Sequence, residues 1–245
     1  MRHHRFLLVW VNWELHKVES SLRPRRAHAY AIFKSLDTVK FVLRLQTRGP
    51  YWMQKSDARV CANAVRFGNL ETLTWLREEG FQWDERATEL AAGSGHLKML
   101  QWILEQKDGV WTTNGLKLAA AKGHLHVVQW WRNERKEYWF HFASVYAAKY
   151  GHLEILKSMA SETSFRLRRR GSSLRASELA AAAAGGHLHV VRWIVEENST
   201  FSDGYIRDPK AWASQCAAEN GHVRVVEYLT ANEHDPSARK RIKRE

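Results

Sequence analysis

Five histidines occupy one position of a repeated motif, each directly after a glycine: His96, His124, His152, His187 and His222. Imidazole is a common metal ligand, but the ligands of one ion converge on one site, often from positions three or four residues apart. Here successive histidines are 28 or 35 residues apart. If the repeats stack as helical layers, neighbouring imidazoles lie roughly 10 Å apart. That distance excludes a shared metal ion, so we expect no metal site.

Aromatic residues form a second series, seven residues after the glycine in six of seven copies: Phe41, Trp75, Trp102, Trp130, Trp193 and Tyr228. The exception is Ser158. Such rings could stack on nucleic-acid bases. However, the residues four, five and eight after the glycine are mostly aliphatic, which places the aromatic at or beside an apolar helix face. The series therefore favours core or half-exposed packing.

Catalytic motifs are absent from the sequence. It contains no Gly-x-Gly-x-x-Gly, Walker A, His-Glu-x-x-His or Gly-x-Ser-x-Gly pattern. Cys61 and Cys216 fall on the apolar side of expected helices, where small buried residues are more common than nucleophiles. The sequence thus predicts neither an enzyme nor a cofactor.

The repeat itself predicts pairs of short helices. Its glycine, or the residue in its place, falls at positions 34, 68, 95, 123, 151, 186 and 221, with spacings of 34, 27, 28, 28, 35 and 35. Alanines before the glycine favour a first helix that a neighbour can approach closely. The glycine ends that helix, and an apolar stripe defines a second helix, with Leu125 expected between the layers. One pair cannot bury this stripe alone, so the pairs must stack as an all-α solenoid.

The unit L-x-L-A-A-x-x-G-H-L-x-V-V-x-W resembles the second part of the ankyrin repeat. The resemblance covers about residues 27–232 and implies an ankyrin-like helical solenoid of about seven helix-turn-helix repeats. The period of 27–28 residues is shorter than the usual one of about 33. The shortfall implies truncated hairpin links, as in the short-period ankyrin arrays of some protists and large DNA viruses. The resemblance also implies that the five histidines make structural hydrogen bonds near the turn, whereas His126 and His189 are expected at the surface.

Ankyrin repeats bind other proteins, so the resemblance predicts a protein–protein interaction scaffold or adaptor. In that family the concave groove is lined by the two residues before the glycine. Carried over to this chain, the partner-binding strip includes large or basic side chains at six positions: Phe33, Arg66, Phe67, Lys122, Lys149 and Tyr150. Aromatic residues and arginine are enriched at protein interfaces. The partner's identity is not encoded in the fold.

The net charge of +12 is concentrated outside the repeat body. Residues 1–60 carry 12 basic and 4 acidic side chains, a net +8, and the tail 237–245 carries 5 and 1, a net +4. One insertion, near 160–175, holds a basic loop with Arg166, Arg168, Arg169 and Arg170, and a second lies near 198–210. These segments leave open a nucleic-acid binder that contacts phosphates nonspecifically. A substrate-recruiting subunit, as in a ubiquitin ligase, is a further alternative.

The sequence also predicts how the chain divides into segments and in which compartment it is found. We expect an N-terminal basic segment or cap at 1–26, the array at 27–232 and a basic, disordered tail at 233–245. No apolar run reaches the roughly 20 residues that cross a bilayer, so no membrane partner is expected. Two distant cysteines suggest a reducing compartment and therefore an intracellular protein, cytoplasmic or nuclear. A monomer is expected.

Overall fold

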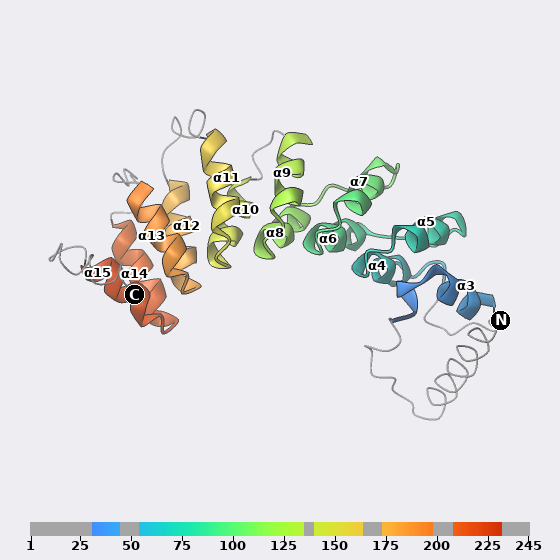
Figure 1. Cartoon of the computed structure of the whole chain (residues 1–245), viewed down its shortest axis with the longest axis horizontal. Helices are drawn as coiled ribbons and strands as arrows, with labels where there is room; N and C mark the ends of the chain where they lie inside the picture. Colours follow the sequence, from blue (N-terminus) through green and yellow to red (C-terminus); the bar gives the residue numbers. More distant parts are fainter. Residues whose placement is uncertain (1–30, 45–53, 135–139, 164–172, 198–207, 232–245) are drawn as a thin grey trace, which may run out of the picture. The chain divides into compact units, whose positions relative to one another are not determined.

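The computed structural model describes residues 31–44, 54–134, 140–163, 173–197 and 208–231 (Figure 1). In these ranges every regular element is a helix, as the sequence predicts. The chain divides into two compact units, residues 1–83 and 84–245. The segment 1–26 and the tail 233–245 lie outside the described residues. Among the described helices, none has the length and apolar character needed to cross a membrane.

The described residues of unit 1 form a short 3-10 helix and three α-helices: η1 (Ala31–Lys34), α3 (Leu36–Arg44), α4 (Arg59–Arg66) and α5 (Leu70–Glu78). Its first copy of the repeat is degenerate, because η1 replaces the first helix. Asn69 takes the place of the histidine and makes two bonds. Its Oδ1 accepts from the backbone N–H of Thr72 at 2.9 Å, and its Nδ2 donates to the carbonyl of Lys34 at 3.0 Å. The buried Val39, Leu73 and Leu76 form part of its core.

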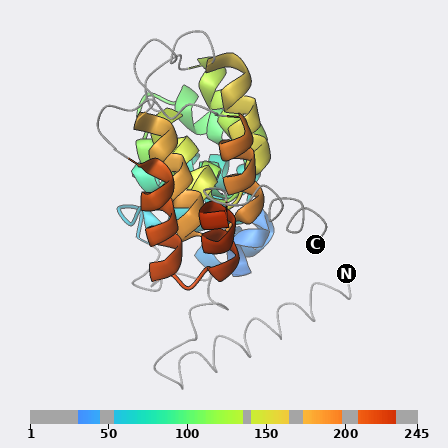
Figure 2. The same cartoon turned by 90° about the vertical axis from the view of Figure 1, so that its left-hand side faces the viewer.

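The described residues of unit 2 form five helix pairs: α6 (Glu85–Gly93) and α7 (Leu97–Glu105), α8 (Thr113–Ala121) and α9 (Leu125–Glu134), α10 (Phe140–Lys149) and α11 (Leu153–Thr163), α12 (Ser173–Ala184) and α13 (Leu188–Glu197), α14 (Pro209–Glu219) and α15 (Val223–Ala231). The first helices pack in the order α6, α8, α10, α12 and α14, each against the next. Figure 2 shows the last pairs of this unit stacked one behind another. This arrangement is the predicted helical solenoid.

The turn between the two helices of a pair is set by the alanines and the glycine. In the α8–α9 pair the backbone N–H of His124 donates to the carbonyl of Ala119 at 2.9 Å, and that of Gly123 donates to Ala120 at 3.3 Å. These two bonds satisfy carbonyls at the end of α8 and require a left-handed residue, which Gly123 supplies with φ of 79°. Ala119 and Ala120 are fully buried, so neighbouring first helices approach closely there.

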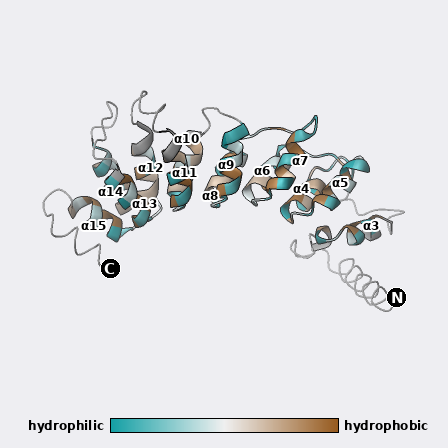
Figure 3. Ribbon diagram, turned by 45° about the horizontal axis from the view of Figure 1, so that its top comes forward, coloured by the Kyte–Doolittle hydropathy of each residue, from teal (hydrophilic) through white to brown (hydrophobic). Residues whose placement is uncertain are grey.

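The second helices bury the residues four, five and eight after the glycine. In α9 these are Val127, Val128 and Trp131, all buried. The residue two after the glycine was also expected between the layers, but that prediction is wrong: Leu125 is only half-buried. It lies at the first turn of the helix, outside the arc that the other three positions cover. In Figure 3 the helices carry both hydrophobic and hydrophilic residues, as expected of helices with one buried side.

Candidate protein-binding surface

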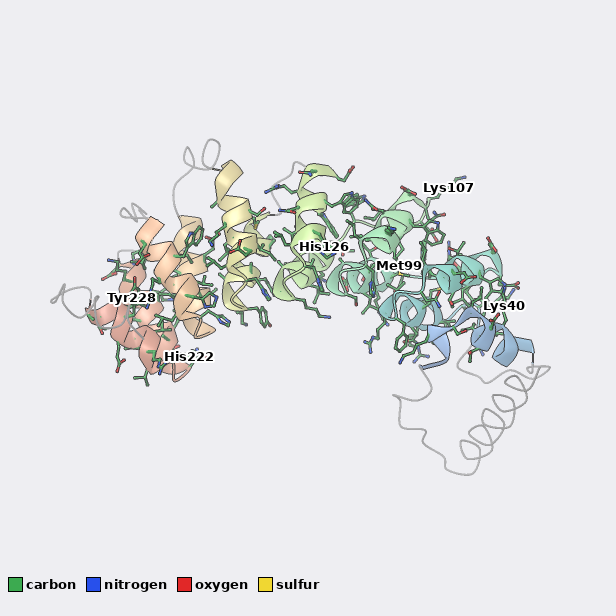
Figure 4. All side chains as sticks on the ribbon, viewed as in Figure 1. Lys40, Met99, Lys107, His126, His222 and Tyr228 are labelled. Carbon is green, nitrogen blue, oxygen red and sulfur yellow. The ribbon has the colours of Figure 1, made fainter. Side chains whose placement is uncertain are left out.

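Three of the histidines that follow the repeat glycine connect their repeat to the one before it. Nε2 of His124 lies 3.1 Å from the carbonyl oxygen of Gly93, Nε2 of His152 lies 2.9 Å from that of Ala121, and Nε2 of His222 lies 3.0 Å from that of Ala184. A carbonyl oxygen only accepts, so Nε2 carries the hydrogen in each bond. The expected structural hydrogen bonds are confirmed for these three histidines, and they run between repeats. Figure 4 labels His222, which precedes α15.

A second pair of histidines makes similar bonds that sequence reasoning missed. His126 and His189 are exposed, as expected, yet each donates from Nε2 at 2.9 Å to a glycine carbonyl of the preceding repeat, Gly95 and Gly151 respectively. Their rings lie 6.0 Å from His124 and 5.9 Å from His187, respectively. The signal was present in the sequence, because both repeats contain His-Leu-His.

The surroundings of His124 and His187 favour the neutral imidazole. Burial lowers the pKa of His124 below 6.5, and the positive charges of His126 and Lys122 lower it further, although its bond to Gly93 acts in the opposite direction. Burial and the neighbouring His189 likewise lower the pKa of His187. Within the ranges described, no three His, Cys, Asp or Glu side chains form a cluster able to hold a metal ion. The histidines therefore serve packing and hydrogen bonding.

The aromatic series contacts side chains of the preceding repeat. The residue six after one glycine meets the residue seven after the next: Nζ of Lys40 lies 5.5 Å from the Trp75 ring centre, and Cζ of Arg192 lies 5.7 Å from that of Tyr228. At these distances a cation is attracted to the electron-rich ring face. Trp75 is half-buried and Tyr228 is buried, as the packing interpretation predicts.

Ser158, the exception in that series, meets polar partners instead. Nε2 of Gln129 donates to its Oγ at 3.2 Å, and Nη1 of Arg132 donates to its carbonyl at 2.8 Å. Both donors come from α9, the second helix of the preceding repeat. The side chains of Gln129 and Arg132 thus occupy the space beside position 158, and the small serine leaves room for them.

The tryptophan of the link before α8 packs on two tryptophans of α9. The ring of Trp111 stacks on Trp130 at 5.5 Å between centroids and meets Trp131 edge-on at 5.2 Å. These three rings close the end of the α8–α9 pair.

Unit 1 contributes three of the six predicted strip residues. Phe33 is fully buried, so its assignment to a binding strip is wrong. It stands in the degenerate first copy, where its ring belongs to the core of the unit. Arg66 is exposed, and Phe67 is half-buried with Nζ of Lys34 5.6 Å from its ring centre.

The other three predicted strip residues lie in unit 2. Lys122 and Lys149 are exposed, each at the C-terminal end of a first helix, and Tyr150 is 49% exposed. Nζ of Lys149 lies 5.9 Å from the Tyr150 ring centre. Since α8 packs against α10, these side chains belong to adjacent helices.

Four further residues extend this region, and sequence reasoning missed them. Leu118, Phe142 and Tyr146 are 37%, 47% and 36% exposed, and Nζ of Lys117 lies 4.8 Å from the Phe142 ring centre. The signal was their spacing, since residues four apart share a helix face. We call the combined region the α8–α10 surface; it comprises Lys117, Leu118, Lys122, Phe142, Tyr146, Lys149 and Tyr150.

The predicted basic loop, with Arg166, Arg168, Arg169 and Arg170, lies outside the described residues. The same is true of the basic segments at both ends, on which the nucleic-acid alternative also depends.

Comparison with known proteins agrees with the helix pairs. Residues 144–240 match the family model of ankyrin repeats in three copies. This range begins within α10 and extends past α15, so it spans the last three pairs of the solenoid. This part of the chain consists of ankyrin repeats. No curated protein matches the sequence. Ankyrin repeats generally mediate protein–protein interaction and generally act as scaffolds rather than enzymes.

Proposed function

We propose that this chain is a scaffold or adaptor that binds another protein through the exposed face of its first helices, with the α8–α10 surface as the main contact. Four of the seven large hydrophobic residues that are exposed in the described part of the chain lie in this one region: Leu118, Phe142, Tyr146 and Tyr150. Exposed aromatic side chains gathered in one place are typical of interaction sites.

The rigidity of the repeat joints supports this function. Side chains on α8 and α10 are presented from helices that hydrogen bonds and buried alanines fix against each other. A preformed surface loses little conformational freedom on binding, so a few anchor side chains can suffice.

The test is site-specific photocrosslinking in cells of the source organism. A crosslinking amino acid placed at Tyr150 should capture a defined protein, whereas one at Lys98, exposed in α7, should not. A protein captured at Tyr150 should also be lost from pull-downs with the Lys149→Ala/Tyr150→Ala variant and retained with Lys98→Ala. Equal capture at both positions, or equal retention by both variants, would refute the proposal.

The setting we infer is the cytoplasm or nucleus, with the protein as a monomer. The chain has two cysteines, Cys61 and Cys216, far apart in the sequence, a usage that suits a reducing compartment. Fluorescence microscopy of the tagged chain and sedimentation of the purified protein test these two statements.

A further inference from the structure

We propose that the α8–α10 surface binds an acidic protein segment whose apolar side chains pack on the rings of Phe142, Tyr146 and Tyr150 while its carboxylates meet Lys117, Lys122 and Lys149. This inference rests on the proposed function and specifies the chemistry of the partner.

The aromatic residues form a ridge along α10. Phe142, Tyr146 and Tyr150 follow one another at intervals of four residues, so they occupy one side of the helix and span about 12 Å. Their exposed fractions are 47%, 36% and 49%. Three neighbouring rings of this size offer a partner segment several apolar contacts in a row.

The flanking helix α12 leaves this ridge open on one side. Relative to the repeat glycine, the equivalent residues of α12 are Ser177, Ala181 and Gly185, all small. Because α12 packs directly against α10, the rings extend further from the helices than these neighbours do. A bound segment can therefore contact the sides of the rings as well as their tips.

The charge of the region is one-sided. Neither α8 nor α10 contains an aspartate or glutamate, whereas Lys117 lies in α8, Lys122 directly follows α8 and Lys149 ends α10. Carboxylates do occur on the flanking first helices, at Glu89 in α6 and Glu178 in α12. The flanking helices also carry arginines, Arg86 in α6 and Arg175 in α12, so of these four helices only α8 and α10 carry positive charge without any carboxylate, which complements an acidic partner.

The positions of the lysines also favour a protein over a nucleic acid as the partner of this surface. Nζ of Lys117 lies 4.8 Å from the Phe142 ring centre and Nζ of Lys149 lies 5.9 Å from that of Tyr150. A ring face next to an ammonium group is less accessible to a stacking base, which needs the whole face. A carboxylate can pair with the same ammonium group while an apolar side chain contacts the ring edge, so the geometry favours a protein segment.

The test measures binding of fluorescent peptides to the full chain by anisotropy. The probe is a 15-residue peptide in which glutamate alternates with leucine and phenylalanine. One control peptide has glutamine for glutamate, a second has serine for the apolar residues, and a third probe is single-stranded oligothymidine. We expect the acidic apolar peptide to bind at least about tenfold more tightly than each of the other three.

Two variants locate the binding, and a third is the matched control. Lys122→Glu/Lys149→Glu and Tyr146→Ser/Tyr150→Ser should each weaken the peptide at least about tenfold, and Lys98→Glu should change it less than about twofold. Circular dichroism identifies any variant that fails to fold. The unmodified chain gives an independent measurement, since its affinity for the acidic peptide should fall as salt rises.

Several outcomes would overturn the inference. These are equal binding of the glutamate and glutamine peptides, salt-independent binding by the unmodified chain, and equal losses in all three variants. Oligothymidine bound as tightly and with the same variant sensitivity would assign the surface to nucleic acid. If the peptides fail while photocrosslinking at Tyr150 still captures a protein, the partner chemistry is wrong and the proposed function stands; if both fail, both are wrong.

Discussion

The imidazole of His152 lies directly against the backbone of Gly123, the glycine that ends the first helix of the preceding repeat. A Cβ atom on Gly123 would lie 2.8 Å from both Nδ1 and Cε1 of that ring, closer than such atoms pack in proteins. Glycine is thus required at position 123 for two separate reasons: its φ is 79°, and the His152 ring lies against it. At Gly221 only the backbone reason applies, because its φ is 75° but nothing lies within 4 Å of a Cβ atom added there.

Substitution of these two glycines should therefore have unequal effects. Gly221→Ala should lower the free energy of unfolding by roughly 1–2 kcal/mol, the cost of a left-handed backbone for an L-residue. Gly123→Ala should lower it by about 1 kcal/mol more, because the histidine ring must also move. Urea denaturation followed by circular dichroism measures both values. Equal losses of unfolding free energy in the two variants would show that the His152 ring moves aside without a cost in stability.

Two leucines of α7 test which positions form the core. Leu100 is fully buried, whereas Leu97, two residues after the glycine, is half-buried. Leu100→Ala should cost about 2–5 kcal/mol in unfolding free energy, and Leu97→Ala should cost less than half of that, because a partly exposed side chain leaves a smaller cavity. Chemical denaturation of the two variants, compared side by side, gives the ratio. A larger loss at Leu97 would contradict the observed packing.

Restoring the aromatic pattern at position 158 should destabilise the protein. Ser158→Trp matches the other repeats in sequence, but the space is occupied by Gln129 and Arg132, which bond to this serine. We expect a loss of about 1–3 kcal/mol from overpacking. The control is Lys157→Trp, one residue away and exposed, which should be nearly neutral. A thermal unfolding scan compares the unfolding temperatures of the two variants. A Ser158→Trp variant more stable than the unmodified chain would contradict this explanation.

Stability should fall as the solution becomes acidic. Burial keeps the pKa of His124 and His187 below 6.5 in the folded state, so the unfolded chain binds protons more readily there. Their contribution is therefore fully present above pH 6.5 and is lost as the pH falls through the folded pKa. The unfolding midpoint in urea should be lower at pH 5 than at pH 7.5. In His124→Gln/His187→Gln this difference should shrink, and an unchanged difference would assign the effect to other groups.

The fold was predictable from the sequence because its determinants are local. Alanines, the glycine and the apolar stripe specify each helix pair, and their repetition specifies stacking. Phe33 could not be placed in the same way, because its copy lacks the glycine and the histidine, so only the structure shows that its ring is buried. The prediction that Leu125 lies between the layers used only the helical period. The period does not show at which residue near the start of the helix the buried face begins.

The surface was harder to predict than the core. Lys122, Lys149 and Tyr150 were placed by their position before the glycine, and they are exposed. Phe142 and Tyr146 look like core residues by composition, because aromatic side chains are usually buried. Their exposure depends on how α8 and α12 flank α10, a tertiary relationship that no single repeat encodes.

The joints between repeats give the array a direction along the chain. The imidazoles of His124, His152 and His222 each bond to a main-chain carbonyl of the preceding repeat, so the joint depends on a backbone atom of the earlier module and one side chain of the later one. A module copied or removed by recombination would thus regenerate the same joint with its new neighbour. The exposed residues of α8 or α10 could then diverge independently, giving a lineage new specificities without redesigning how its modules fit together.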